Sequence, residues 1–389
     1  MLKKYDFDEV IDRIGTNCNK WDGIELSSDP IALWVADMDF AVPDEIVQAI
    51  KSRLDHRIFG YTMRAQGWES SIISWLSRRH GWDVKSEWIK FSPGVVPAIA
   101  MAIQSCTDEG DGVLIQPPVY PPFSKTVING SRKLVENPLK LVDGRFEMDY
   151  DDLERKLSSE NVKLALLCSP HNPSGRVWKR DELERFASIC LSRGVVIFSD
   201  EIHSDIIYSG NKHIPIAGIN SDIADITMTA MSTSKTFNLA GLAASEMIIP
   251  NDGLRKKYSK TLDFIHVGGG NIFGDIATVA AYENGGEWLD QMLKYLECSI
   301  DFMDKFLSEE IPKLKLMRPE GTYVPLIDCC QLELSPLELE SLFKDEARVV
   351  LNAGYTFGKQ AEGFMRINIA APRSVLAEGL KRIKTAISG

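Results

Sequence analysis

Residues 195–203 read VVIFSDEIH, four apolar side chains followed by serine, aspartate and glutamate. Runs this short and this apolar suit strands that are covered on both faces. Comparable runs occupy 113–115, 164–168, 226–228 and 247–249. Between two of them, residues 181–193 place apolar side chains on one helical face, begin with acidic residues and precede Gly194. This alternation of strands and helices predicts an α/β domain with a mostly parallel sheet.

The two ends of the chain follow a different pattern. A long stretch of helical periodicity, two short strand candidates and a closing helix follow one another at 288–308, 323–327, 364–369 and 374–387. The first forty residues are too short for a domain of their own. We therefore predict a large three-layer α/β/α domain at 46–284, and a smaller α+β domain built from both chain ends, 1–45 and 285–389.

Composition narrows the functional class. The chain has 389 residues, with 44 Lys and Arg against 55 Asp and Glu, so its formal net charge is −11. This balance argues against nucleic acid, whose binding needs a basic surface, and against anionic membranes. No apolar run approaches the roughly 18 residues that span a bilayer. The N-terminal sequence MLKKYDFDEVIDR lacks the apolar core of a signal peptide.

Cysteine and histidine argue against a metal enzyme. The seven cysteines form no C-x-x-C pair, and the six histidines are scattered without an H-E-x-x-H spacing. We therefore expect no metal site. We expect the thiols to be free and buried, as is typical of a reducing compartment. The expected location of the protein is therefore the cytoplasm.

Polar side chains follow three of the predicted strands. SPHNPSG occupies 169–175, SDEIH occupies 199–203 and TAMSTSKT occupies 229–236. In open α/β sheets, ligands bind at the carboxyl ends of the strands. We therefore expect these three segments to converge on one rim.

Each candidate on this rim also has an ordinary structural interpretation. Lys235 can form a Schiff base with a carbonyl if its amine is partly desolvated, or it can be an exposed loop lysine. Asp200 can face a cationic heterocycle, whose protonated nitrogen makes the ring an electron sink, or it can cap a helix. Asn172 can bind a ring hydroxyl or simply begin a turn.

A candidate anion site lies further towards the N-terminus. Gly94-Val95-Val96-Pro97 follows a strand-like 88–91 and opens a helix through 98–104. A helix that begins after a glycine turn can bind phosphate, although a plain strand–helix connection has the same sequence. Ser232 and Ser234 add hydroxyl donors. Taken together, these parts are those that a pyridoxal phosphate site requires.

The motifs, in this order, resemble the fold-type I pyridoxal-phosphate enzymes of the class I/II aminotransferase superfamily. Asn172 and Asp200 are separated by 28 positions, and Asp200 and Lys235 by 35, as the resemblance requires. FMRIN at 364–368 resembles the family segment that carries the arginine for the substrate carboxylate, which gives Arg366. Four further segments resemble the cystathionine β-lyase (C–S lyase) subgroup: WVADMDF at 34–40, GVVPAI at 94–99, PVYPPF at 118–123 and PHNPSGRVW at 170–178.

The resemblance implies a role for each candidate. Lys235 would bind the cofactor covalently and act as the catalytic base. Arg366, with Asn172 and Tyr120, would bind the substrate. The other cofactor contacts would be Asp200 at the ring nitrogen, Asn172 and His203 near the ring hydroxyl, Tyr120 on the ring face, and Val95, Val96, Ser232 and Ser234 at the phosphate. Tyr61, in FGY, would reach the phosphate of a neighbouring subunit, which implies a homodimer.

Two positions depart from the common pattern of the superfamily. Many aminotransferases have a phosphate-binding arginine eight residues after the lysine, where this chain has Ala243. Many also have tyrosine at the position of His203. Trp34, Asp37 and Asp39 match the opening segment of the subgroup, either as part of the substrate side or in a structural role.

The resemblance predicts β-elimination on cysteine S-conjugates such as L-cystathionine, giving homocysteine, pyruvate and ammonia. The first alternative is an aminotransferase acting on an L-amino acid. The second is a regulator that retains the cofactor-bound fold. The candidate residues alone do not separate these outcomes, because the first chemical steps are shared.

Overall fold

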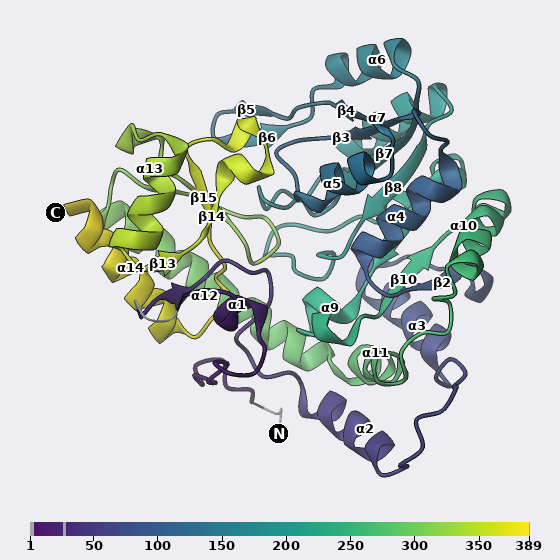
Figure 1. The fold of residues 1–389 in the computed structure, drawn as a ribbon, viewed down its shortest axis with the longest axis horizontal. Coiled ribbons are helices and arrows are strands. Elements are labelled where there is room, and N and C mark those ends of the chain that lie inside the picture. The colour runs from purple at the N-terminus through teal and green to yellow at the C-terminus, as the bar shows by residue number, and fades with distance from the viewer. Residues whose placement is uncertain (1–3, 26–28, 389) are drawn as a thin grey trace.

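The computed structural model describes residues 4–25 and 29–388. At its centre lies a seven-stranded sheet (Figure 1). In spatial order its strands are β2 (Ile89–Ser92), β10 (Ser245–Ile248), β9 (Thr227–Met231), β8 (Val196–Asp200), β7 (Val162–Cys168), β3 (Gly112–Ile115) and β4 (Lys133–Glu136). The strands from β9 to β4 run parallel, whereas β10 runs antiparallel to both β9 and β2. The prediction of an α/β fold with a mostly parallel sheet is confirmed.

Helices cover both faces of this sheet. Along β7, Leu164 packs into one buried cluster and its neighbour Ala165 into another, because successive side chains of a strand point to opposite faces. The cluster around Leu164 is closed by α4 (Val95–Cys106), α5 (Pro122–Asn129) and α10 (Asp252–Phe264). The cluster around Ala165 is closed by α6 (Tyr150–Ser159), α7 (Arg180–Ser192) and α8 (Ser221–Asp225). The result is the expected three-layer arrangement.

Both chain ends contribute to a second region. It contains a four-stranded antiparallel sheet, in the order β11 (Lys315–Met317), β12 (Leu326–Asp328), β15 (Phe364–Arg366) and β14 (Asn352–Ala353). The helices of this region are α12 (Gly286–Glu310), α13 (Pro336–Ser341) and α14 (Arg373–Ser388). The N-terminal strand β1 (Ile31–Ala32) pairs in parallel with β13 (Val349–Val350), and so joins the two ends of the chain. The domain boundaries proposed above, 46–284 against the rest, stay a prediction.

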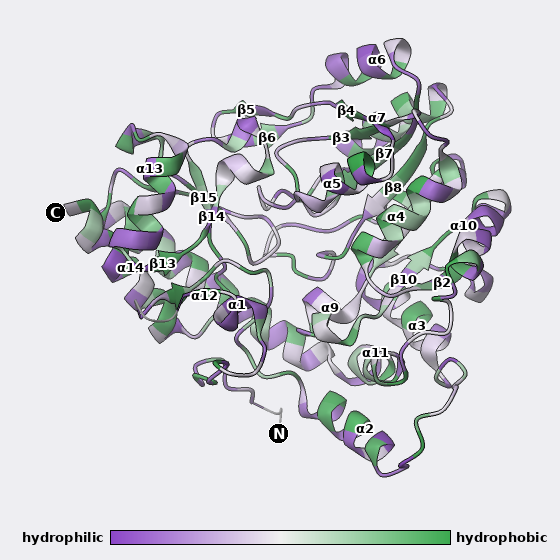
Figure 2. Cartoon of the chain, viewed as in Figure 1, coloured by the Kyte–Doolittle hydropathy of each residue, from purple (hydrophilic) through white to green (hydrophobic). Residues whose placement is uncertain are grey.

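The remaining elements connect these regions. Two helices, α2 (Asp44–Leu54) and α3 (Trp68–His80), each pack against α11 (Ile272–Asn284). Short elements complete the fold: α1 (Asn19–Asp22), α9 (Thr233–Thr236) and the hairpin of β5 (Lys140–Val142) and β6 (Arg145–Glu147). Figure 2 shows hydrophobic residues along the strands of the central sheet and hydrophilic ones on outer helices such as α6. No helix among the described residues is both long and apolar enough to cross a membrane.

The two C-terminal strands are shorter than expected. The candidates at 323–327 and 364–369 become β12 and β15, which pair only over Leu326–Asp328 and Phe364–Arg366. Beyond this pairing, Ile367 donates from its backbone N–H to the carbonyl of Pro325 at 3.0 Å. Because proline has no N–H to return the bond, the ladder is interrupted at Pro325, although the N–H of Ile369 still donates to the carbonyl of Tyr323 at 2.9 Å. The N–H of Asn368, between these two donors, instead bonds to the carbonyl of Leu33 at 2.9 Å.

Candidate active site

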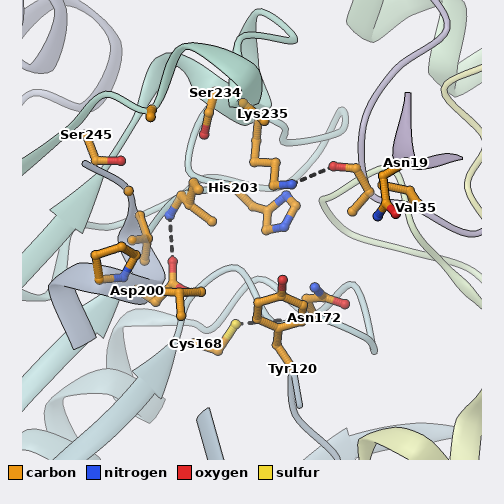
Figure 3. A pocket seen from close by; sticks show the side chains of 18 of the residues that line it. Asn19, Val35, Tyr120, Cys168, Asn172, Asp200, His203, Ser234, Lys235 and Ser245 are labelled. Carbon is orange, nitrogen blue, oxygen red and sulfur yellow. Dashed lines mark hydrogen bonds between the residues drawn. The ribbon is translucent and has the colours of Figure 1, made fainter. Parts of the chain in front are cut away.

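A pocket of about 390 Å³ lies where the two regions meet, at the carboxyl ends of the central strands (Figure 3). Asp200 comes from the last position of β8, Asn172 from the segment after β7, and Lys235 from α9 after β9. Arg366, in β15, closes the pocket from the second region. The expectation that three strand ends converge on one rim therefore agrees with the geometry, since all three segments line this single pocket.

Among residues 4–25 and 29–388, no carboxylate forms an ion pair with the amine of Lys235. Its Nζ donates to the carbonyl oxygen of Ala36 at 2.5 Å. Burial lowers the pKa of this amine to about 8, although the nearby negative charge of Asp37 acts in the opposite direction. An amine in this state is partly neutral near physiological pH, which is the form that attacks a carbonyl or accepts a proton.

Asp200 is buried beneath the same cavity. Burial raises the pKa of its carboxyl to about 7. Two groups act in the opposite direction and lower this pKa: the backbone N–H of Ile202, which donates to Oδ1 at 3.1 Å, and the positive charge of Lys235. A buried carboxylate of this kind gains most from a cationic hydrogen-bond donor. A protonated pyridine nitrogen has that chemistry.

Arg366 carries a buried positive charge. Its Nη1 donates to Oδ1 of Asn172 at 2.9 Å, and its Nη2 donates to the carbonyl of Trp34 at 2.9 Å and to Oδ1 of Asn352 at 2.5 Å. All three acceptors are neutral, and within the described ranges no carboxylate forms an ion pair with this guanidinium. Burial lowers the pKa of Arg366 to about 10, and its Nε has no hydrogen-bond partner. A carboxylate ligand would supply the missing negative charge.

The predicted phosphate donors separate into two groups. Val95 and Val96, at the start of α4, line the pocket, as does Ser234. Ser232 does not line it. Its hydroxyl donates to the carbonyl of Ala244 at 2.8 Å and accepts the N–H of Ser234 at 3.0 Å, so that it caps α9 from the buried side. Its predicted contact with phosphate has no support in this geometry and stays a prediction.

Two aromatic candidates line the pocket and one does not. Tyr120 is half-buried there, and burial raises the pKa of its phenol. His203 is buried, and burial holds the pKa of its imidazole well below the ordinary value, so the ring is neutral. The Nδ1 of His203 has no hydrogen-bond partner. Tyr61 is fully exposed and lies outside the pocket of its own chain. Its contact with a neighbouring subunit stays a prediction.

The opening segment has a clear place in the structure. Trp34 lines the pocket, whereas Asp37 and Asp39 form an ion cluster with two cations. Arg13 contacts Asp37 through Nη2 at 2.6 Å and Asp39 through Nη1 at 2.6 Å. Lys20, whose side chain is 0% exposed, contacts Asp39 at 2.7 Å. The structural interpretation of the two aspartates is thus the one that the contacts support.

Sequence reasoning missed several pocket residues, namely Asn19, Cys168, Ser245 and Asn352. Cys168 could have been found, because it ends the strand before SPHNPSG. Asn19 and Asn352 belong to elements of four and two residues, which leave no periodic signal. No cluster of three His, Cys, Asp or Glu able to hold a metal ion occurs in residues 4–25 and 29–388.

The residues present fit pyridoxal phosphate. Asp200 offers a buried carboxyl for a ring nitrogen. Lys235 offers an amine for an aldehyde, and the start of α4 with Ser234 offers neutral donors for a phosphate. The orphaned Nδ1 of His203 and Nε of Arg366 mark polar groups of the site that the protein itself leaves unsatisfied.

Comparison with known proteins agrees with this fit. A family model described as aminotransferase class I and II matches residues 28–383, and the chain belongs to that family. Cystathionine beta-lyase PatB of Bacillus subtilis (strain 168) is 45% identical over 386 residues, which are 98% of this chain and 100% of the relative. The resemblances stated above, to the superfamily and to the lyase subgroup, are confirmed.

Two solved structures are similar over almost the whole chain. Cystalysin from Treponema denticola, which contains a pyridoxal 5'-phosphate cofactor, has a TM-score of 0.96 and 36% identity, covering 99% of each chain. A pyridoxal-phosphate-bound protein from Clostridium difficile 630, provisionally named an aminotransferase, has a TM-score of 0.96 and 45% identity, covering 99% of this chain and 100% of its own.

Proposed function

We propose that this protein is a pyridoxal-phosphate-dependent carbon–sulfur lyase that acts on cysteine S-conjugates such as L-cystathionine. The observation that supports the cofactor chemistry is the convergence of Lys235, Asp200, Asn172 and Arg366 on one pocket. The preference for a lyase rests on the 45% identity with cystathionine beta-lyase PatB over the full length of that relative.

Each residue of the pocket has a separate role in the proposed elimination. Pyridoxal phosphate, when bound, withdraws electrons from the substrate's Cα. Asp200 keeps the ring nitrogen protonated, and Arg366 fixes the substrate carboxylate by charge-assisted hydrogen bonds. The neutral amine of Lys235 accepts the Cα proton. The bond between Cβ and sulfur breaks, the thiolate leaves with the bonding electrons and takes up a proton, and water converts the three-carbon remainder to pyruvate and ammonia.

An aminotransferase is the second candidate, because the family includes such enzymes and the Clostridium difficile protein carries that name. It would retain the amino group and need a keto acid to complete its cycle. The deciding assay incubates the cofactor-loaded protein with L-cystathionine and no keto acid. We expect homocysteine and pyruvate in equal amounts over many turnovers. Absence of both products contradicts the lyase, and turnover that starts only when a keto acid is added identifies an aminotransferase.

We further infer a homodimer in the cytoplasm. Tyr61 projects fully exposed from a segment that also exposes Ile58, Phe59 and Met63, which favours burial against another subunit. All seven cysteines are free, which is typical of a reducing compartment, although the expectation that they are buried holds only for Cys168, Cys190 and Cys329. A light-scattering mass near twice the chain mass of 43.5 kDa is expected, and a monomer mass contradicts the dimer.

A further inference from the structure

Ion pairs hold the segment around α1 against the active site. Lys20, the second residue of α1, is 0% exposed and pairs with Asp39 at 2.7 Å. Arg13 contacts both Asp37 and Asp39, each at 2.6 Å. The backbone carbonyl of Lys20 accepts the indole N–H of Trp34 at 2.9 Å. Two cations and two carboxylates thus fix α1 to a wall of the pocket without adding net charge.

This anchoring places the side chain of Asn19 on the rim of the pocket. Figure 3 shows Asn19 beside Val35, on the far side of Lys235 from Asp200. Within residues 4–25 and 29–388, the side-chain amide of Asn19 has no hydrogen-bond partner. The side chain of Asn19 is exposed at this rim, where a ligand that extends away from the Asp200 end can contact it.

A second cavity of about 420 Å³ begins where the first ends. The two cavities share Asn19 and Ala240, and the second is also lined by Arg13, Asp37 and Asp39. A substrate held at its carboxylate by Arg366, with its Cα near Lys235, can extend a long polar side chain past Asn19 into this second cavity. The dimensions favour a substrate longer than cysteine itself.

We propose that Asn19 is a specificity residue, which recognises the polar, zwitterionic end of the leaving thiol in long cysteine S-conjugates. This inference rests on the proposed lyase function. L-Cystathionine carries an ammonium and a carboxylate on its leaving half, with no net charge. A side-chain amide offers both a donor and an acceptor and suits such a group. A charged residue here would favour one end of the zwitterion and repel the other.

The test compares two substrates in Asn19→Ala. We expect KM for L-cystathionine to rise about tenfold, the size of one lost hydrogen bond to a charged group. For S-methyl-L-cysteine, whose leaving group has no ammonium or carboxylate for Asn19 to bind, KM should change less than about twofold. Asn129→Ala makes the same substitution at an exposed asparagine of α5 outside the pocket, and should leave both values unchanged.

Binding is measured separately from turnover. Calorimetric titration of each substrate into Lys235→Ala, with and without Asn19→Ala, should show the same selective loss of affinity for L-cystathionine. Equal changes for both substrates, or no change for either, overturn the role of Asn19. If the unsubstituted protein eliminates neither substrate, it is the proposed function that fails. Unfolding temperatures of Asn19→Ala and Asn129→Ala show whether folding is intact in either case.

Discussion

Two lysines lie close to the active site in opposite electrostatic surroundings. Lys20 has a carboxylate at 2.7 Å and a second at 3.8 Å, and its side chain is wholly buried. In the part of the chain that the structure describes, the amine of Lys235 donates only to the carbonyl of Ala36, at 2.5 Å, and its pKa is lowered to about 8. A buried lysine that pairs with carboxylates can serve as a structural anchor, whereas burial without such a partner makes the neutral amine accessible. The contrast favours the proposal that Lys235 is the reactive lysine and Lys20 an anchor.

The largest effect is expected at Lys235. Lys235→Ala removes both the amine that binds the cofactor and the base that takes the Cα proton, so turnover should fall about 10³-fold or more. The visible absorption band of the bound cofactor should also change. Lys125→Ala, at an exposed lysine of α5, is the matched control and should leave both unchanged. An unaltered spectrum in Lys235→Ala contradicts the assignment of the cofactor lysine.

The next effect is expected at Arg366. Arg366→Lys keeps a positive charge but loses the planar pair of donors, so KM for L-cystathionine should rise about tenfold to a hundredfold with a smaller change in kcat. Steady-state kinetics measure this split. Arg193→Lys, at an exposed site after α7, serves as control. A fall in kcat with KM unchanged would show that the guanidinium does not bind the substrate.

Lys20 should affect stability and selectivity. Lys20→Met leaves Arg13 as the remaining cation in contact with Asp39. We expect the free energy of unfolding to fall by about 3 kcal/mol, which is near the lower end of the cost of breaking a buried ion pair. Denaturant titration of the cofactor-free protein measures it, with the exposed Lys51→Met as reference. Because α1 carries Asn19, discrimination between L-cystathionine and S-methyl-L-cysteine should weaken as well. Unchanged stability contradicts the anchoring role.

The smallest effect is expected at Asp37, whose negative charge raises the pKa of Lys235. The rate at which the cofactor-free protein captures pyridoxal phosphate should increase with pH through about 8, because only the neutral amine attacks the aldehyde. Asp37→Asn should move this midpoint to lower pH. Stopped-flow absorbance at several pH values measures the shift, and Asp222→Asn is the exposed control. A midpoint that moves to higher pH contradicts the electrostatic account.

Much of the rim could be predicted from the sequence. Asp200, Asn172 and Lys235 follow apolar runs, and the carboxyl ends of parallel strands share one edge, so their convergence follows from local pattern and sheet geometry. Arg366 could be placed only through the family resemblance, since its strand belongs to the other region. Its neutral partners Trp34 and Asn352 are 332 and 14 positions away along the chain.

Other parts depend on tertiary contacts that local pattern does not encode. Ser232 and Ser234 look equivalent in sequence, yet only Ser234 lines the pocket, because the cap of α9 turns the hydroxyl of Ser232 towards Ala244. Lys20 lies in the polar segment TNCNKWDG and resembles an exposed lysine. Its burial follows from Asp39, which lies 19 positions further along the chain.

The central claim is that the unpaired Lys235, and not the paired Lys20, binds the cofactor. The most direct measurement loads the protein with pyridoxal phosphate, reduces the bond between its aldehyde and the lysine amine with borohydride, and maps the label by peptide mass spectrometry. We predict one labelled lysine per chain, in the peptide that contains Lys235. A label on Lys20 or on any other lysine, or no label at all, would contradict the account.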